Sequence, residues 1–303
     1  MTVLELPAGI RVAVEKPYDE ATFTLTEAVT TDRRVVTVAS VDDALAELTR
    51  RCRRWPQAAA VCDDVLRSVS SVSVFAGVIT ESLAYSTLQS GPEFARWLDE
   101  RGPAQLPELP DPVQAERRGG TLSIRFNRTR RHNAFTTDAR AALLEALEVA
   151  RLDDSVTEVV LAGNGPSFCS GGDLAEFGTF ADPASAHLAR TRHSPALVLA
   201  ELAGRLGPGC RAEVHGQVLG SGLEMAAYCG HIRCHPDATI GLPELALGLI
   251  PGAGGTVSIT RRIGRWRTAY LVLSGATIDA ATALAWGLVD EISADVPAGS
   301  PAR

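Results

Sequence analysis

From residue 121 onward, short apolar runs with strand composition alternate with amphipathic helical segments, and this alternation restricts the possible folds more than any other feature. The runs are, in order, TLSIRFN, TTDARAALLEALEVARLD, VTEVVLAG, PALVLAELAGRL, RAEVHGQV and GHIRCHPDATIGL. Strand-like and helix-like periodicities that alternate in this way predict an α/β fold built from stacked βαβ units.

The first 110 residues follow a different pattern. They begin with the short β-type runs IRVAVE, TFTLTEAV and RRVVTVAS, and helical periodicity then dominates residues 41–101. The proline-rich stretch GPAQLPELPDP at 102–112 predicts a linker. We therefore expect an N-terminal extension at 1–110, with short strands followed by helices, and a second unit at 113–303.

Composition excludes several classes of partner. The net charge of −7 disfavours general binding to nucleic acid or to an anionic membrane, and the basic cluster RRCRRW is typical of a solvated helix face. No apolar run approaches the ~20 residues that a membrane helix needs. The acidic residues near the N-terminus do not fit a signal peptide, so we predict a cytoplasmic protein.

Lysine and cysteine usage narrows the chemistry. Lys16 is the only lysine, which argues against a Schiff base, a pyridoxal site or a P-loop. The six cysteines include no C-x-x-C pair, and we expect all of them to be reduced packing residues. Neither a metal site nor a cofactor is predicted.

Two glycine-rich turns separate a strand from a helix, GNGPSFCSGGDL at 163–174 and GSGLE at 220–224, and a third such turn, GAGG, lies at 252–255. In GSGLE, Ser221 and Glu224 have the S-x-x-E spacing of a capping box, which is the ordinary interpretation. The alternative is functional, because backbone N–H groups at two such turns can converge on one oxyanion. Neither turn has a nucleotide-phosphate motif.

Glu224 and Glu244 share an unusual setting. Neither has a basic residue three or four positions away, and both are surrounded by Leu, Ala or Met. Pro243 also permits a structural interpretation of Glu244, with proline at the first helical position and an acid in the first turn. A buried, unpaired carboxylate has a raised pKa, which suits proton transfer near neutral pH.

The motifs FCSGGDL, VHGQVLGSGLEMAAYC and IGLPELALGLIPGAGGT occur in this order, after FNRTRRHNAF and before LSGATIDAATALAWGLVDEI. Together they resemble the crotonase superfamily, the enoyl-CoA hydratase/isomerase proteins, over about residues 115–291. The resemblance implies a crotonase-like (ClpP/crotonase) fold of stacked ββα units. It also implies that the N–H groups of Gly172 and Ser221 form an oxyanion hole and that Glu224 and Glu244 are the catalytic acid/base pair.

Around this pair the resemblance implies a set of substrate-binding positions: Arg128, Arg130, Arg131, Asn133, Ala134, Ser170, Gly171, Asp173, Leu174, Gly220 and Pro243. Three positions depart from the family pattern. Ser221 replaces a usual Gly or Ala, Thr129 replaces a usual Pro, and Ala175 stands where a lysine near the coenzyme A phosphates is common. The three arginines are expected to supply that charge instead.

The C-terminal part also departs from the family, because the sequence ends 14 residues after Val289. We expect a truncated C-terminal helical region, with helices from 41–101 covering the apolar surface that the family's C-terminal helices cover. A cofactor-free dioxygenase branch of the superfamily has a long N-terminal helical region as well, so this branch remains an alternative.

The favoured function is hydration of a 2-enoyl-CoA, with coenzyme A as part of the substrate and a homo-oligomer (trimer or hexamer) as the assembly. Alternatives are an enoyl-CoA isomerase, a thioester hydrolase, the dioxygenase, or a non-catalytic acyl-CoA-binding or assembly protein. Three nearby residues are expected to be structural, with His215 packed at a strand end, Asp173 capping a helix and Cys169 buried.

Overall fold

The computed structural model describes residues 2–69, 71–105, 110–180 and 182–296. Its N-terminal part begins with a four-stranded sheet in the order β1-β2-β3-β4, antiparallel between β1 and β2 and parallel elsewhere. The strands are β1 (Thr2–Glu5), β2 (Arg11–Val14), β3 (Phe23–Thr26) and β4 (Val35–Thr37). The three β-type runs predicted from sequence therefore form β2, β3 and β4.

Four helices follow, as the periodicity of 41–101 predicts. They are α1 (Val41–Arg54), α2 (Pro56–Ser68), α3 (Val74–Gln89) and α4 (Pro92–Arg101). Ser40 and Ser73 cap α1 and α3, because each hydroxyl accepts an N–H from the first turn at 3.2 Å. The predicted linker follows α4, and its residues 106–109 lie outside the described residues.

The second part contains a six-stranded sheet and a three-stranded sheet. The larger one has the order β13-β10-β8-β7-β6-β5 and is parallel except for the β5–β6 pair. Its strands are β5 (Val113–Arg118), β6 (Thr121–Phe126), β7 (Glu158–Gly163), β8 (Cys210–Val214), β10 (His231–Cys234) and β13 (Glu291–Ile292). The smaller sheet consists of β9 (Gln217–Leu219), β11 (Thr239–Gly241) and β12 (Thr277–Ile278).

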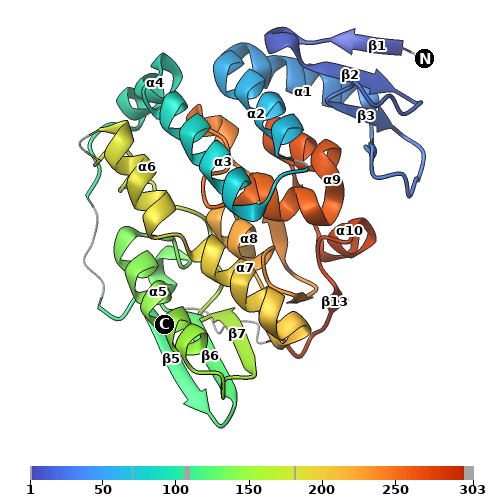
Figure 1. The fold of residues 1–303 in the computed structure, drawn as a ribbon. Coiled ribbons are helices and arrows are strands. Elements are labelled where there is room, and N and C mark those ends of the chain that lie inside the picture. The colour runs from blue at the N-terminus through green and yellow to red at the C-terminus, as the bar shows by residue number, and fades with distance from the viewer. Residues whose placement is uncertain (1, 70, 106–109, 181, 297–303) are drawn as a thin grey trace.

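Helices cover these sheets and connect them to the N-terminal part (Figure 1). They are α5 (Thr137–Leu152), α6 (Pro183–Arg192), α7 (Pro195–Leu206), α8 (Ser221–Ala226), α9 (Gly255–Ser274) and α10 (Ala280–Trp286). Helices α5 and α7 pack on each other and against the larger sheet, while α1, α2 and α3 all contact α9. One hydrophobic core cluster includes residues from both parts.

Two predicted runs divide between the two sheets. GHIRCHPDATIGL forms β10 in the larger sheet and β11 in the smaller one. The run RAEVHGQV was expected to be one strand, but it divides into β8 and β9, which belong to different sheets. Gly216 makes the bend with a φ of +54°. A Cβ at this position would lie 2.0 Å from the carbonyl oxygen of Pro166, so the chain needs glycine here.

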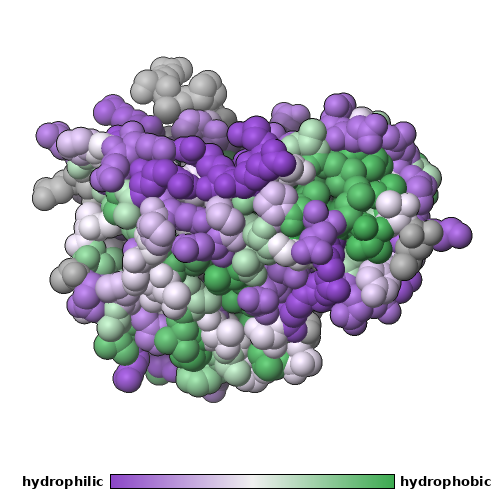
Figure 2. Space-filling model, turned by 90° about the horizontal axis from the view of Figure 1, so that it is seen from above, coloured by the Kyte–Doolittle hydropathy of each residue, from purple (hydrophilic) through white to green (hydrophobic). Residues whose placement is uncertain are grey.

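The surface over the N-terminal helices is mostly polar. Seen from above, hydrophilic residues form a band across the upper left and centre of the view, while hydrophobic residues gather at the right and in smaller patches along the lower part (Figure 2). None of the helices in the described part of the chain is both long enough and apolar enough to cross a membrane.

Candidate active site

Two turns predicted to bind an oxyanion lie side by side. The segment before the first turn pairs with β9, since Cys169 N–H donates to Gln217 O at 3.1 Å and Leu219 N–H donates to Cys169 O at 3.0 Å. A Cβ on Gly171 would lie 3.3 Å from Leu219 O, and the φ of this glycine is +96°. Glycine thus lets the first turn lie directly against the second.

Gly172 comes directly after Gly171 on the first turn, and Ser221 lies two residues after Leu219 on the second. Both residues line the same pocket. Within the described residues, neither N–H has a backbone or side-chain acceptor. Two N–H donors on adjacent turns of one pocket are the kind of groups that an oxyanion site requires.

The capping-box interpretation of GSGLE is wrong. The N-cap of α8 is Gly220, and Ser221 is the first helical residue, so its hydroxyl is not placed to cap. The Glu224 carboxylate does not reach back to its own helix start either. It accepts instead from Ala253 N–H at 2.7 Å and from Gly255 N–H at 2.8 Å.

Glu224 is buried against the start of α9. Both of its hydrogen bonds use Oε2, while Oε1 has none from the described residues. Burial raises the pKa of Glu224 to about 7, although the N–H groups of the GAGG loop oppose this effect. This carboxylate can therefore change its protonation state near neutral pH.

Glu244 begins a short 3₁₀ helix, Glu244–Leu247, and its carboxyl group lies against Gly220. A Cβ on Gly220 would lie 2.5 Å from Glu244 Oε1, so only glycine leaves room for this carboxyl group. Glu244 Oε2 is buried without a hydrogen-bond partner. Burial raises the pKa of Glu244 well above its usual value, and the charges of Glu224 and Glu81 raise it further. With no partner for Oε2, the charged form of Glu244 is less stabilised by hydrogen bonds than that of Glu224.

Glu81 is a third buried carboxyl group in the pocket, and sequence reasoning missed it. Its Oε1 accepts from Gly254 N–H at 2.7 Å. Its Oε2 accepts from the N–H and the hydroxyl of Thr256, at 2.9 and 2.7 Å. Burial and the Glu224 charge raise the pKa of Glu81 to about 8. The sequence criterion that singled out Glu224 and Glu244 also applies to Glu81, because it has no basic residue three or four positions away.

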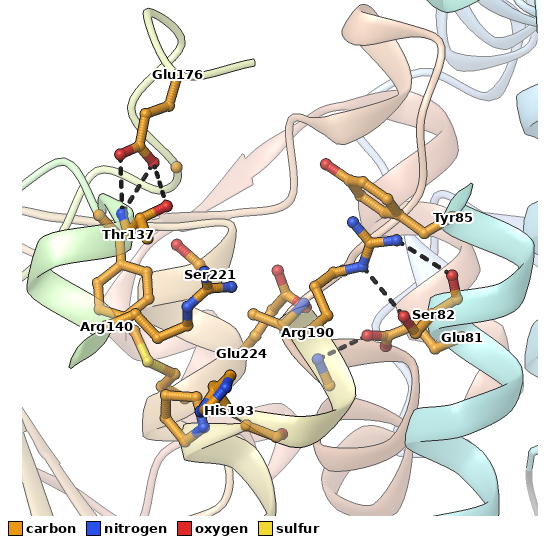
Figure 3. A pocket seen from close by; sticks show the side chains of 18 of the residues that line it. Glu81, Ser82, Tyr85, Thr137, Arg140, Glu176, Arg190, His193, Ser221 and Glu224 are labelled. Carbon is orange, nitrogen blue, oxygen red and sulfur yellow. Dashed lines mark hydrogen bonds between the residues drawn. The ribbon is translucent and has the colours of Figure 1, made fainter. Parts of the chain in front are cut away.

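The pocket has a volume of about 180 Å³ and lies between the N-terminal helices and the second part of the chain. Figure 3 shows Glu81, Ser82 and Tyr85 entering from α3, Arg140 from α5 and Glu224 from α8. Phe177 covers Gly172 and also packs against Phe94 and Trp97 of α4. The N-terminal segment therefore forms one wall of this pocket.

The predicted catalytic residues Glu224, Glu244, Gly172 and Ser221 all line this pocket. In the described chain, the predicted substrate-binding residues do not line it. Gly171 and Gly220 shape its turns, whereas Arg130, Leu174 and Pro243 are exposed and Ser170 is half-buried.

Asp173 organises the predicted arginines rather than capping a helix. It pairs with the buried Arg128 at 3.0 Å and with Arg131 at 2.8 Å. Arg128 also donates to Ala134 O. Asn133 connects this loop to the carbonyl groups of Asn164 and Ser167, at 2.8 and 2.7 Å.

Because Arg128 is buried in this ion pair, it does not present its charge to an external phosphate. Arg130 and Arg131 are exposed, and Arg131 shares the Asp173 carboxylate with Arg128.

Two of the three residues expected to be structural, His215 and Cys169, are packed as predicted. His215 is buried at the end of β8, and its Nε2 donates to Gly165 O at 2.9 Å. Cys169 is fully buried, and burial raises the pKa of its thiol to about 12. Neither group is suited to nucleophilic catalysis here.

The family described as Enoyl-CoA hydratase/isomerase matches residues 116–298, which leaves Glu81 outside the matched region. The chain is 34% identical over 171 residues to the 2,3-dehydroadipyl-CoA hydratase of Escherichia coli (strain K12), covering 56% of this chain and 65% of the relative. It is 34% identical over 161 residues to the peroxisomal bifunctional enzyme of Danio rerio, covering 53% of this chain and 21% of the relative. The chain thus spans less than two thirds of both relatives.

Solved structures give the same result for the fold. An enoyl-CoA hydratase from Thermoplasma volcanium GSS1 matches with a TM-score of 0.52 and 34% identity, over 61% of this chain and 72% of that one. Pseudomonas aeruginosa AtuE matches with a TM-score of 0.53 and 33% identity, over 61% of this chain and 70% of that one. The predicted crotonase-like fold is confirmed.

Proposed function

Because this chain belongs to the enoyl-CoA hydratase/isomerase family, we propose that it adds water to the double bond of a 2-enoyl-CoA thioester. The observation that carries this proposal is one pocket lined by two free N–H groups and two buried glutamates with raised pKa values. Proton transfer beside an oxyanion site is the chemistry that hydration of an enoyl thioester requires.

The N–H groups of Gly172 and Ser221 hold the thioester oxygen and stabilise the negative charge that develops on it as the enolate forms. A donor of this kind typically contributes about 3–4 kcal/mol to the lowering of the barrier. Because both N–H groups belong to glycine-shaped turns packed against each other, they are oriented before substrate binds.

The two glutamates have different hydrogen-bond environments, and this difference assigns their roles. Glu224 receives two N–H bonds that favour its ionised form, and it keeps Oε1 for a water molecule. It takes one proton from this water while the water oxygen bonds to the β carbon. Glu244 acts in its protonated form and gives its proton to the α carbon. The product gains one water molecule in total, and the proton on Glu224 returns to Glu244 before the next cycle.

The test is to mix the full chain with 2-enoyl-CoA esters of several chain lengths and to follow the loss of the conjugated thioester absorbance. Formation of a 3-hydroxyacyl-CoA supports hydration. A shifted double bond, free coenzyme A or oxygen consumption would identify the isomerase, hydrolase or dioxygenase alternative. Binding without any reaction would identify an acyl-CoA-binding protein.

Three further expectations belong to this proposal and rest mainly on the family and the sequence. They are a homo-oligomer (trimer or hexamer), a cytoplasmic location and a reaction that needs no cofactor beyond the coenzyme A of the substrate. The six cysteines are free and buried, which is compatible with a reducing compartment. Light scattering of the purified chain tests the assembly.

A further inference from the structure

Arg140 carries a positive charge in the pocket wall and forms no ion pair with a carboxylate of the described residues. It extends from α5 into the pocket that contains Gly172, Ser221 and Glu224 (Figure 3). In the described chain, its guanidinium group has no hydrogen bond and no ion pair, and burial lowers its pKa. A partly buried, unpaired guanidinium group is costly unless it binds an anion.

The closest acid in this wall does not pair with Arg140. Glu176 accepts from Thr137 N–H at 2.9 Å with each of its two oxygens, and from the Thr137 hydroxyl at 3.3 Å. Its carboxylate is thus committed to the first turn of α5. The positive charge of Arg140 remains available to a ligand.

Arg190 adds a second positive charge with only neutral partners. It donates from α6 to Ser82 Oγ at 3.1 Å, to Gln89 Oε1 at 3.0 Å and to Ser86 Oγ, and it stacks over Tyr85 at 4.5 Å. No carboxylate among the described residues lies within ion-pair distance of it. Two guanidinium groups without an ion pair in the described chain therefore line a pocket whose proposed reaction needs only an apolar acyl chain.

We propose that the acyl group of the natural substrate ends in a carboxylate and that Arg140 binds this carboxylate. This inference rests on the proposed function. A coenzyme A phosphate has the same anionic chemistry, but a long pantetheine arm separates the phosphates from the thioester. An anion that shares a pocket of about 180 Å³ with the thioester belongs to the acyl part.

The test compares two 2-enoyl-CoA esters of equal carbon number, one ending in a methyl group and one ending in a carboxylate. The carboxylate ester is expected to have a kcat/KM at least about tenfold higher. Arg140→Met should lower kcat/KM for this ester by about 10- to 100-fold, as expected for the loss of a charge-assisted hydrogen bond. It should lower kcat/KM for the methyl ester much less than for the carboxylate ester. Arg267, which is buried without an ion pair outside the pocket, provides the control Arg267→Met.

Calorimetric binding of the two saturated acyl-CoA esters, which does not depend on turnover, separates the possible failures. Equal loss of affinity for both esters in Arg140→Met would assign the arginine to a phosphate and overturn the proposal. Equal affinities of the unmodified protein for both esters would also overturn it. If the carboxylate ester binds better but no ester is hydrated, only the proposed function fails.

An independent observation concerns Glu81. Both of its oxygens are occupied by N–H and hydroxyl donors from residues 254–256, so it is not free to hold a reacting water. These residues belong to the same loop whose Ala253 and Gly255 N–H groups bind Glu224. The ionisable groups around Glu81 are Glu224 on α8, Glu244, Tyr85 on α3, Tyr228 after α8 and Arg190 on α6.

We infer that Glu81 is a positioning residue, which fixes the loop that holds Glu224 and, once it ionises at alkaline pH, disfavours ionisation of Glu244. This inference also rests on the proposed function. Glu81→Gln removes the charge and should move the alkaline limb of the pH profile of kcat/KM down by about 1 unit. Glu81→Asp, which retains the charge, should restore much of the original profile.

Glu93 offers a matched control. It is buried in the N-terminal segment and accepts two backbone N–H groups, from Gln57 at 2.7 Å and Ala58 at 3.0 Å, but it does not line the pocket. Glu93→Gln should cost stability without moving the pH profile. Carbon-13 NMR titration of glutamate carboxyl groups gives the pKa of Glu244 without turnover. An unchanged pKa of Glu244 in folded Glu81→Gln would overturn the assignment, even if the protein hydrates no ester.

Discussion

Glu81 and Glu224 divide the backbone N–H groups of one loop between them, in alternation along the chain. Glu224 binds the N–H groups of residues 253 and 255, and Glu81 binds those of residues 254 and 256. The two carboxylates come from α8 and α3, which are far apart in sequence. The N-terminal segment is therefore connected, through this loop, to the residue proposed to activate water.

Gly255 packs against the side chain of Glu224 so closely that a larger residue would displace it. A Cβ there would lie 2.4 Å from Glu224 Cγ and 2.8 Å from its Oε2. Gly255→Ala should displace the carboxylate, lower kcat by about 10²-fold and destabilise the protein by about 1–3 kcal/mol. Activity assays and thermal unfolding measure the two effects.

Gly204, in α7, provides the control, because a Cβ at this position would have no other atom within 4 Å. Gly204→Ala should keep full activity and stabilise the helix by about 0.5–1 kcal/mol. A Gly255→Ala protein as active as Gly204→Ala would contradict the placement of Glu224.

The buried carboxyl groups predict that stability falls as pH rises. The folded-state pKa values of Glu81 and Glu224 are raised to about 8 and about 7, above the unfolded value of 4.5. Their contribution is fully present below pH 4.5, and it is lost as pH rises through the folded pKa values, because the folded state then binds more protons than the unfolded state. The free energy of unfolding should therefore decrease between about pH 5 and pH 9.

For each unit by which folding raises a pKa, the carboxyl group contributes about 1.4 kcal/mol to the free energy of unfolding at low pH. Denaturant unfolding at a series of pH values measures the decrease, and Glu224→Gln should make it shallower. A wild-type curve that is flat over this range would show that the carboxyl groups are not protonated in the folded state.

Ser221 should matter through its backbone N–H and not through its hydroxyl. Because it is the first residue of α8 and not the N-cap, Ser221→Ala should change both activity and stability little. Ser221→Pro removes the N–H at a position where helices tolerate proline, and the loss of an oxyanion donor should lower kcat by about 10²- to 10³-fold.

Circular dichroism and acyl-CoA binding establish whether the proline variant is folded before its rate is measured. A folded Ser221→Pro protein with normal turnover would exclude this N–H from the mechanism.

Much of the fold was predictable because its elements follow local periodicity. The four N-terminal helices and the alternation from β6 to β11 are where the sequence patterns place them. The division of RAEVHGQV was not predictable, since it depends on the close approach of Gly216 to Pro166, which are distant in sequence. Hydrophobic alternation does not reveal when a strand changes sheets.

The candidate site was predictable where motifs are local. Gly172, Ser221, Glu224 and Glu244 lie on turns that the glycines mark, and all four line the pocket. Glu81 was not predicted, because its environment consists of a loop more than 170 residues away. The burial of Arg128 was not predicted for the same reason, because it depends on an ion pair with Asp173, which is distant in sequence.

The central claim is that Glu224 and Glu244 exchange protons with the substrate. Glutamine retains the volume of either side chain but not its acid/base function. Glu224→Gln and Glu244→Gln should therefore each lower the kcat for 2-enoyl-CoA hydration by about 10²- to 10⁴-fold, with nearly unchanged acyl-CoA affinity. If either variant binds normally and hydrates at close to the wild-type rate, the two-glutamate mechanism is contradicted.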